Sequence, residues 1–322
     1  MRALVTGAGG FIGAHVAAAL AAAGAEVRAF DRRPPSDPAP GVESVAADLF
    51  DAAALERAIE GCDAVFHLAA LYSYSRADAV AMERVNVGGT RALLAAAARA
   101  GVRRVVHTSS CATCGPVPGR PATERDGPPE YELAVPYKRT KLAGERLALD
   151  AARNGLDVVV VNPTTPVGPG DRGPTPTGKM VADVAGGRAR AYLAGGALNV
   201  VAVEDVAAGH LLAHEKGERG ERYLLGGENL PMREVFALIA CAAGRRPPRV
   251  GIPWRAAWVA AWAANAALRP LGREPSLLVL DEVRLGRLPM TFDDSKARRE
   301  LGYDSHPAAD ALAAATGAAL AR

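Results

Sequence analysis

The sequence predicts an α/β protein: a Rossmann-type, doubly wound parallel sheet with a smaller, interleaved C-terminal substrate lobe. Short apolar runs alternate with alanine-rich stretches, a glycine-rich turn follows the first run, and an aspartate ends the second. This alternation is typical of a parallel sheet covered by helices on both faces. A chain of 322 residues is long enough for two unequal lobes.

The order of elements follows from this alternation. Apolar runs bounded by Gly, Asp or Asn predict strands, and the alanine-rich stretches between them predict helices. In the first half, the predicted strands are 2–5, 26–30, 42–46, 64–67, 104–108 and 157–161, and the predicted helices are 11–23, 52–60, 79–100 and 137–154.

The alternation loosens after two loops rich in Pro and Gly, residues 115–135 and 163–179. Long irregular loops at the carboxyl edge of such a sheet usually hold substrates. The later predicted strands are 199–203 and 222–225, and the later predicted helices are 206–214, 232–243, 254–268 and 308–320. We expect residues 1–165, together with about 199–215, to form the dinucleotide-binding domain. Residues 166–322 would form mainly the substrate lobe.

A glycine-rich turn joins the first predicted strand to the first predicted helix. The sequence TGAGGFIG places Gly7, Gly10 and Gly13 there. Glycine lets this backbone turn tightly and approach a pyrophosphate, which then lies at the helix N-terminus. Strand two ends in Asp31, where an acidic residue would hold the adenosine ribose hydroxyls. A purely structural glycine turn with a solvated aspartate is the alternative interpretation.

The choice between NAD and NADP depends on opposed charges. Asp31 repels a 2′-phosphate and favours NAD, whereas Arg32 and Arg33 directly after it could attract that phosphate and make NADP possible. Asp48 and Leu49, after the third strand, are candidates for contact with the adenine edge.

Three residues form a candidate catalytic set. Tyr137 and Lys141 share one helix face at i and i+4, so the lysine cation would favour the phenolate of its neighbour. Ser110 ends the fifth strand and would donate a hydrogen bond to a carbonyl oxygen, on which Tyr137 would place or remove a proton. Taken singly, Ser110 could be a strand-end cap and Tyr137 a half-exposed aromatic residue.

Two asparagines are further candidates near the cofactor. Asn86 would pin a buried helix backbone or a water chain near Lys141, and it could equally be structural. Asn162 and Pro163 end the sixth strand and would face the nicotinamide amide, with a simple strand terminator as the alternative.

Composition argues against several other classes of protein. The net charge is +3 and the basic residues are scattered, so we expect no nucleic-acid partner. Four cysteines are too few for a disulfide framework, and Cys111-x-x-Cys114 lacks the second pair that zinc normally needs. His210 and His214 share a helix face without a suitable acidic partner, so we expect no metal site. No apolar run reaches the roughly 20 residues of a spanning helix, and the sequence indicates a cytoplasmic protein.

Trp254, Trp258 and Trp262 lie at i, i+4 and i+8 on an alanine-rich predicted helix. Packing against the small lobe is the ordinary explanation of such a stripe. A wall for a lipid-like or terpenoid substrate, or contact with a membrane surface, is the alternative.

The chain resembles an extended short-chain dehydrogenase/reductase, most like the hopanoid-associated sugar epimerase group, with dihydroflavonol reductase-like enzymes next. The motifs that carry the resemblance occur in family order: TGAGGFIG, Asp48-Leu49, His67-Leu68-Ala69-Ala70, Asn86-Val87, Ser109-Ser110 and Tyr137-x-x-x-Lys141. The resemblance implies a Rossmann fold, a small-molecule substrate and a homodimer formed through helices 79–100 and 137–154.

The resemblance also implies which residues serve the site. Ser110, Tyr137 and Lys141 match the catalytic set, and Lys141 would also bond the nicotinamide ribose. The cofactor-binding set comprises Gly7, Gly10, Phe11, Ile12, Gly13, Asp31, Arg32, Asp48, Leu49, Leu68, Ala69, Ala70, Asn86, Tyr137, Lys141, Asn162 and Pro163.

The implied activity is hydride transfer at a secondary alcohol or ketone, by a sugar or sugar-like epimerase or dehydratase. A ketone reductase acting on an apolar substrate is the alternative, and a non-catalytic NAD(P)-sensing protein is an alternative of another class. One departure bears on this choice. Leu198 stands where many nucleotide-sugar enzymes of the family carry an arginine for the diphosphate, and such an arginine is hard to replace.

Overall fold

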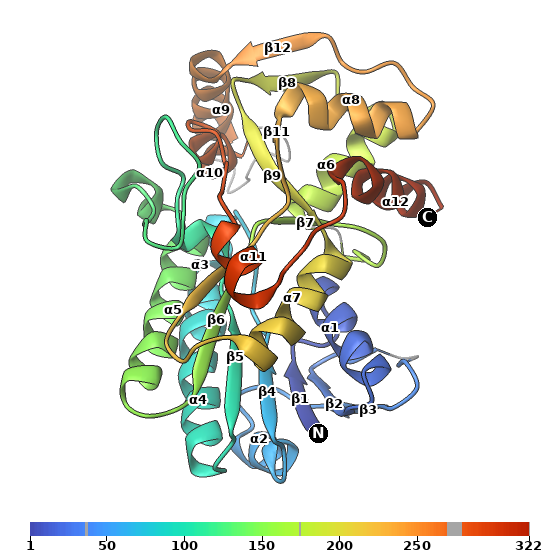
Figure 1. Ribbon diagram of the computed structural model, residues 1–322. Helices are drawn as coiled ribbons and strands as arrows, with labels where there is room; N and C mark the ends of the chain where they lie inside the picture. Colours follow the sequence, from blue (N-terminus) through green and yellow to red (C-terminus); the bar gives the residue numbers. More distant parts are fainter. Residues whose placement is uncertain (36–37, 174, 269–278, 322) are drawn as a thin grey trace.

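The computed structural model describes residues 1–35, 38–173, 175–268 and 279–321. Its larger lobe is built on a seven-stranded sheet in which every neighbouring pair is parallel, with the order β10-β6-β5-β4-β1-β2-β3 (Figure 1). The strands are β1 (Arg2–Thr6), β2 (Glu26–Asp31), β3 (Val42–Ala46), β4 (Ala64–His67), β5 (Arg104–Thr108), β6 (Val158–Pro163) and β10 (Arg222–Leu225).

Helices cover both faces of this sheet, which confirms the predicted doubly wound architecture. Helices α1 (Phe11–Ala22) and α7 (Val203–Lys216) pack on one face, and α2 (Ala52–Ile59), α4 (Thr90–Arg99) and α5 (Pro136–Arg153) pack on the other. Successive strand residues point to opposite faces. Val5 therefore joins the apolar cluster under α1 and α7, while Leu4 joins the cluster under α2, α4 and α5.

The smaller lobe lies above the carboxyl edge of the large sheet (Figure 1). It contains a three-stranded sheet, β7 (Thr165–Val167), β9 (Ala197–Ala202) and β11 (Glu228–Pro231), and a pair, β8 (Ala191–Ala194) and β12 (Val250–Pro253). Its helices include α6 (Pro176–Ala185), α8 (Met232–Ala242), α9 (Trp254–Leu268), α10 (Leu280–Leu285) and α12 (Ala308–Leu320).

The chain crosses between the lobes more often than predicted. The segment expected to join the first domain divides: β9 pairs with β7 and β11 in the small lobe, whereas α7 packs against α1 in the large one. Strand β10 then returns to the edge of the large sheet, and α11 (Ser295–Leu301) packs beside it. Parallel pairing of β10 with β6 is a long-range contact that spacing along the chain does not indicate.

Two predicted segments differ from the structure by more than a few residues at their ends. The loop predicted over 163–179 ends at Thr175, whose hydroxyl accepts a hydrogen bond from the Gly178 amide and caps α6. Pro176 is the first residue of that helix, a position where proline is favoured. The helix predicted over 79–100 is interrupted: α3 (Ala79–Met82) runs into a π-helical segment, Glu83–Gly89, before α4 begins.

Candidate active site

The glycine turn after β1 has no room for side chains. Gly7 has a φ of 76°, and a Cβ there would lie 2.6 Å from the Ala69 amide nitrogen. A Cβ at Gly13 would lie 2.1 Å from the carbonyl oxygen of Gly7, so α1 packs directly on the turn. Gly10 precedes the first residue of α1 and has no side chain to cap it. The first amides of α1 are therefore available to an anion, which is the geometry a pyrophosphate requires.

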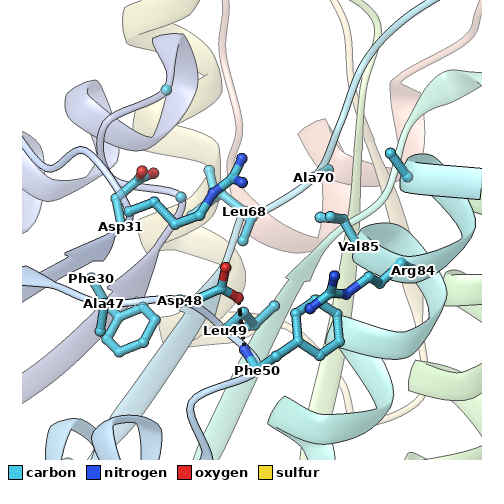
Figure 2. Close-up of a pocket in the computed structure, with 15 residues that line it drawn as sticks. Phe30, Asp31, Ala47, Asp48, Leu49, Phe50, Leu68, Ala70, Arg84 and Val85 are labelled. Atoms are coloured by element: carbon cyan, nitrogen blue, oxygen red, sulfur yellow. Dashed lines mark hydrogen bonds between the residues drawn. The ribbon is translucent and has the colours of Figure 1, made fainter. Parts of the chain in front are cut away.

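A pocket of about 270 Å³ opens beside this turn, at the carboxyl edge of β1, β2 and β4 (Figure 2). This edge includes the boundary between β1 and β4, where the strand order reverses and ligands of doubly wound sheets bind. Nine of the predicted cofactor-binding residues line the pocket: Gly7, Gly10, Asp31, Arg32, Asp48, Leu49, Leu68, Ala69 and Ala70.

Asp31 is fixed by the backbone around it. One carboxylate oxygen accepts a hydrogen bond from the Gly9 amide at 3.2 Å, and the other accepts one from the Arg33 amide at 2.9 Å. Each carboxylate oxygen can accept more than one hydrogen bond. Asp31 therefore retains acceptor capacity for the two hydroxyls of a ribose that enters the pocket.

The lining of the pocket also contains residues that the sequence did not indicate. Arg84 lies with its guanidinium carbon 4.5 Å from the centre of the Phe50 ring, and the Phe50 amide donates to Asp48 Oδ1 at 2.9 Å (Figure 2). The missed lining residues are Phe30, Ala47, Phe50, Ala81, Arg84 and Val85. Arg84 reaches the pocket from the π-helical segment. The only sequence feature that could have pointed to Arg84 as a pocket residue is its position two residues before Asn86.

Several predicted cofactor-binding residues are not among those that line this pocket. They are Phe11, Ile12, Gly13, Asn86, Tyr137, Lys141, Asn162 and Pro163. Phe11, Ile12 and Gly13 form the first turn of α1 behind the glycine turn, and the Phe11 ring packs edge-on against His15.

Asn86 binds protein groups rather than facing the pocket. Its Oδ1 accepts from the Leu71 amide at 2.7 Å, and its Nδ2 donates to the Leu71 carbonyl at 3.0 Å and to Thr140 Oγ1 at 3.1 Å. This side chain is 3% exposed. It therefore ties the loop after β4 to α5, the helix that carries Tyr137 and Lys141.

Asn162 is also turned into the protein. It is fully buried, and its Nδ2 donates to the Ser110 carbonyl at 3.1 Å, to Thr113 Oγ1 at 2.9 Å and to Glu145 Oε2 at 2.7 Å. Arg222 from β10 completes the group, with its Nε 3.2 Å from Glu145 Oε1. Through these hydrogen bonds Asn162 supports the turn that carries Ser110, and its predicted contact with the nicotinamide amide stays a prediction.

Tyr137 and Ser110 lie together at the carboxyl edge of β5. A hydrogen bond with Ser110 lowers the pKa of the Tyr137 phenol, but burial outweighs it and raises that pKa to about 12. The partly buried Tyr137 ring packs on Tyr72, with ring centres 4.4 Å apart, and edge-on against Tyr74 at 6.2 Å. Desolvation is the largest effect of the protein groups on the pKa of Tyr137, so the predicted lowering by Lys141 together with a bound nicotinamide stays a prediction.

Lys141 directs its ammonium to the backbone. Its Nζ donates to the Thr108 carbonyl at 2.8 Å, at the end of β5, and the residue is 6% exposed. Burial lowers the pKa of Lys141 to about 8, and Glu145 one turn further along α5 opposes that shift. The lysine therefore carries its charge at neutral pH and loses it a little above.

The two cysteines of the C-x-x-C pair are free and buried. Burial raises the pKa of each thiol to about 12. Within the part of the chain that the structure describes, no group of three or more His, Cys, Asp or Glu side chains could hold a metal ion.

The turn, the pocket and Asp31 fit a dinucleotide and define a nucleotide-dependent α/β enzyme. The profile of the NAD dependent epimerase/dehydratase family matches residues 3–226, so the chain belongs to that family. It is an NAD-dependent enzyme of the extended short-chain dehydrogenase/reductase type.

Relatives whose names indicate different activities match nearly the whole chain. A Synechocystis protein named "Putative dihydroflavonol 4-reductase" is 40% identical over 96% of this chain and 92% of its own length. Sterol demethylase protein B of Methylococcus capsulatus is 39% identical over 94% and 93%. The crystal structure of a nucleoside-diphosphate-sugar epimerase from Pseudomonas aeruginosa is 31% identical with a TM-score of 0.77, covering 99% of this chain and 97% of that one.

Proposed function

We propose that Ser110, Tyr137 and Lys141 catalyse hydride transfer between NAD and a secondary alcohol or ketone. The observation that carries the proposal is that the Ser110 and Tyr137 side chains meet at the end of β5, where Lys141 is also bonded to the Thr108 carbonyl. When bound, NAD supplies the nicotinamide carbon that accepts or gives up the hydride.

In this proposal, the substrate oxygen lies between two hydroxyl groups. Ser110 donates a hydrogen bond to it, and Tyr137 gives it a proton during reduction or removes one during oxidation. Because burial holds the pKa of Tyr137 near 12, the phenol is protonated at neutral pH and is ready to act as the acid in ketone reduction. Lys141 would position the nicotinamide ribose and contribute positive charge near the phenol.

For the cofactor, Asp31 favours the unphosphorylated ribose of NAD. Its carboxylate, held by the Gly9 and Arg33 amides, would repel a 2′-phosphate. Arg32 and Arg84 also line the pocket and could attract such a phosphate. We propose that NAD is preferred, and that Asp31→Ala shifts the preference toward NADP by removing the repulsion while both arginines remain.

For the substrate, we propose an apolar ketone or secondary alcohol, handled by a reductase or dehydrogenase. The rings of Tyr72 and Tyr74 pack against the ring of Tyr137, so aromatic side chains line the proposed catalytic phenol. Leu198 packs in the apolar cluster of the small lobe. The named flavonoid and sterol relatives support the same substrate class. A sugar epimerase or dehydratase remains the second candidate, supported by the family and by the structurally similar sugar epimerase.

Two measurements test this proposal. Purified protein is mixed with NADH and NADPH in turn and with flavonoid-like, steroid and sugar ketones, and the absorbance of the reduced nicotinamide is followed. A reductase would consume one molecule of reduced nicotinamide for each molecule of apolar ketone that it reduces. Tightly retained NAD in the purified protein, detected by mass spectrometry, together with conversion of a sugar nucleotide without net consumption, would instead establish the epimerase or dehydratase.

Tyr137→Phe tests the catalytic assignment directly. Removing the proton donor should lower kcat by about 10²–10⁴-fold while leaving NAD binding nearly unchanged. Tyr74→Phe is the matched control, because it removes a phenol from the same aromatic group without touching the proposed proton path. Full turnover by Tyr137→Phe, or equal losses in both variants, would contradict the assignment.

We also propose that residues 166–322 mainly bind substrate and that the protein is a homodimer formed through the helices over 79–100 and 137–154. Val80, at the start of the first of these, is 82% exposed, as expected for an apolar residue that a second copy would cover. Light scattering coupled to gel filtration should give twice the chain mass. Val80→Glu should yield monomers, and a monomeric wild-type protein would rule this interface out.

A further inference from the structure

The outer face of α9 is exposed and almost free of charge. Its exposed positions, 255, 256, 259, 260, 262, 263, 266 and 267, recur at helical spacing and form one continuous stripe. After Arg255 they are only Ala, Val or Trp, with Val259 63% and Trp262 61% exposed. The outer face of a helix in a globular domain is normally polar, so a continuous apolar stripe indicates a surface that meets another apolar phase.

The inner face of the same helix packs against the rest of the small lobe. Ala257 and Ala261 are buried in a small apolar cluster, against which Trp254 and Trp258 also pack. These two indoles stack with ring centres 5.5 Å apart, and Trp254 Nε1 donates to the Val283 carbonyl at 2.7 Å. The predicted tryptophan stripe therefore divides: Trp254 and Trp258 pack inward, and Trp262 belongs to the outer face.

A group of arginines lies along the same edge of the small lobe. The parallel strands β8 and β12 begin side by side, and exposed Arg190, Arg245, Arg246 and Arg249 precede them. Strand β12 then leads straight into α9, and its first residue, Val250, is 60% exposed (Figure 1). Residues 245–268 contain four arginines and no Asp or Glu. This edge thus combines exposed apolar residues with positive charge.

We propose that this edge, the outer face of α9 with the arginines before β8 and β12, docks the protein reversibly on an anionic lipid bilayer. Arginines near a bilayer are attracted to anionic head groups, and tryptophan favours the interface between head groups and acyl chains. The uncharged stretch 256–268 is shorter than the roughly 20 residues of a spanning helix. In the described residues, no helix is long and apolar enough to cross a membrane, so the contact is with the surface.

The positive charge of this face favours an anionic bilayer over a second copy of the chain as its partner. A symmetric contact with a second copy would bring two arginine-rich, acid-free edges into one interface, where like charges repel. An anionic lipid surface satisfies the arginines and covers Val259 and Trp262 together. The docking edge contains none of the proposed catalytic residues, so its test stands or fails separately from the proposed function.

The three tryptophans of the chain are all in α9, so intrinsic fluorescence reports on this helix alone. The protein is mixed with large unilamellar vesicles of phosphatidylcholine alone, or of phosphatidylcholine and phosphatidylglycerol in equal amounts. We expect sedimentation with the anionic vesicles only, with a shift of emission to shorter wavelength. Trp262→Phe should lose most of the shift, because Trp254 and Trp258 already face the protein.

Two sets of variants separate the apolar from the charged contribution. Val259→Glu with Trp262→Glu should abolish vesicle binding, since both positions are exposed and enter the bilayer in this proposal. Arg245→Gln, Arg246→Gln and Arg249→Gln together should weaken binding on the order of tenfold or more. Leu320→Glu is the matched control: it places a charge on an apolar residue that is 53% exposed on α12, and binding should persist.

Circular dichroism establishes that each variant is folded before binding is compared. The proposal is overturned if the wild-type protein ignores anionic vesicles, binds neutral ones equally well, or binds unchanged after the double glutamate substitution. A wild-type oligomer that this double substitution dissociates, without vesicle binding, would assign the face to a second copy instead.

Discussion

The two ends of the candidate active site are held together in different ways. The cofactor end depends on backbone contact: Gly7 and Gly13 touch neighbouring main chain so closely that a Cβ does not fit. The proposed catalytic end depends on buried charged and polar side chains: Glu145 accepts a hydrogen bond from Asn162 and forms an ion pair with Arg222, next to the Ser110 turn.

Because of this difference, the two ends of the site are sensitive to opposite kinds of substitution. A site built from close backbone contacts is disturbed by adding atoms, because neighbouring main chain cannot move aside cheaply. A site built from buried charges is disturbed by removing one partner, because the remaining charge is left without compensation.

The largest effect on stability is expected at the buried pair formed by Glu132 and Lys138. Both side chains are almost completely buried and bonded to each other, and Lys138 Nζ also donates to the Gly115 carbonyl at 2.8 Å. This pair ties the loop over 115–135 to α5. Glu132→Ala should lower the free energy of unfolding by about 3–5 kcal/mol, because Lys138 is left charged and buried.

Denaturant unfolding measures this effect, and a double variant supplies the control. Glu132→Leu combined with Lys138→Met removes both charges and keeps the volume, so most of the lost stability should return. Equal destabilisation in the single and double variants would show that the charges are not what matters at this position.

A buried charge can also cost stability, and Lys141 should show it. The pKa of Lys141 is about 8 in the folded protein, below the ordinary 10.5, so the unfolded chain binds the proton more tightly than the folded protein does. The loss of stability caused by the buried charge is therefore fully present below pH 8. It declines as the pH rises from 8 to 10.5 and is absent above 10.5. Lys141→Met should therefore stabilise the protein by up to about 3 kcal/mol at pH 7 and by little near pH 11, while reducing activity.

The same pKa predicts how the activity of the wild-type enzyme depends on pH. As the pH rises through about 8, Lys141 loses the charge proposed to assist Tyr137 and the ribose, so kcat/KM for ketone reduction should fall. A profile that is flat up to pH 10, or a Lys141→Met variant less stable than wild type at pH 7, would count against a charged lysine at this place.

The smallest of these effects on stability is expected at the cofactor end. Gly13→Ala places a methyl group 2.1 Å from the Gly7 carbonyl, which should cost about 1–3 kcal/mol and weaken NAD binding by displacing the turn. Gly127→Ala is the control, because a Cβ there meets nothing within 4 Å. Calorimetric titration with NAD and thermal unfolding measure both; unchanged NAD affinity in Gly13→Ala would show that the turn adapts.

Much of the large lobe could be predicted because its signals are local. Strands such as β3, β4, β5 and β10 have the predicted bounds, and the glycine turn and Asp31 meet at one pocket as their order along the chain indicated. The short strands β7, β8, β11 and β12 were missed; three of them, β7, β11 and β12, contain proline, which argues against a strand in the sequence.

The side-chain partners could not be predicted in the same way. The hydrogen bonds of Asn86 to Thr140 and of Asn162 to Glu145 join residues that lie far apart in the sequence, so no local pattern indicates them. Arg84 lies in a π-helical segment and its guanidinium packs over the ring of Phe50, and the residue spacing of an α-helix does not indicate this contact.

Six strands of the large sheet, the dinucleotide turn and the order of the proposed catalytic residues could be predicted from the sequence alone, because these depend on glycine conformation and on periodicities of a few residues. Only the tertiary structure decided that Tyr137 is a protonated phenol beside Ser110, that Lys141 bonds to Thr108, and that Trp262 faces outward. Desolvation and exposure depend on residues brought together from distant segments, and no local pattern contains that information.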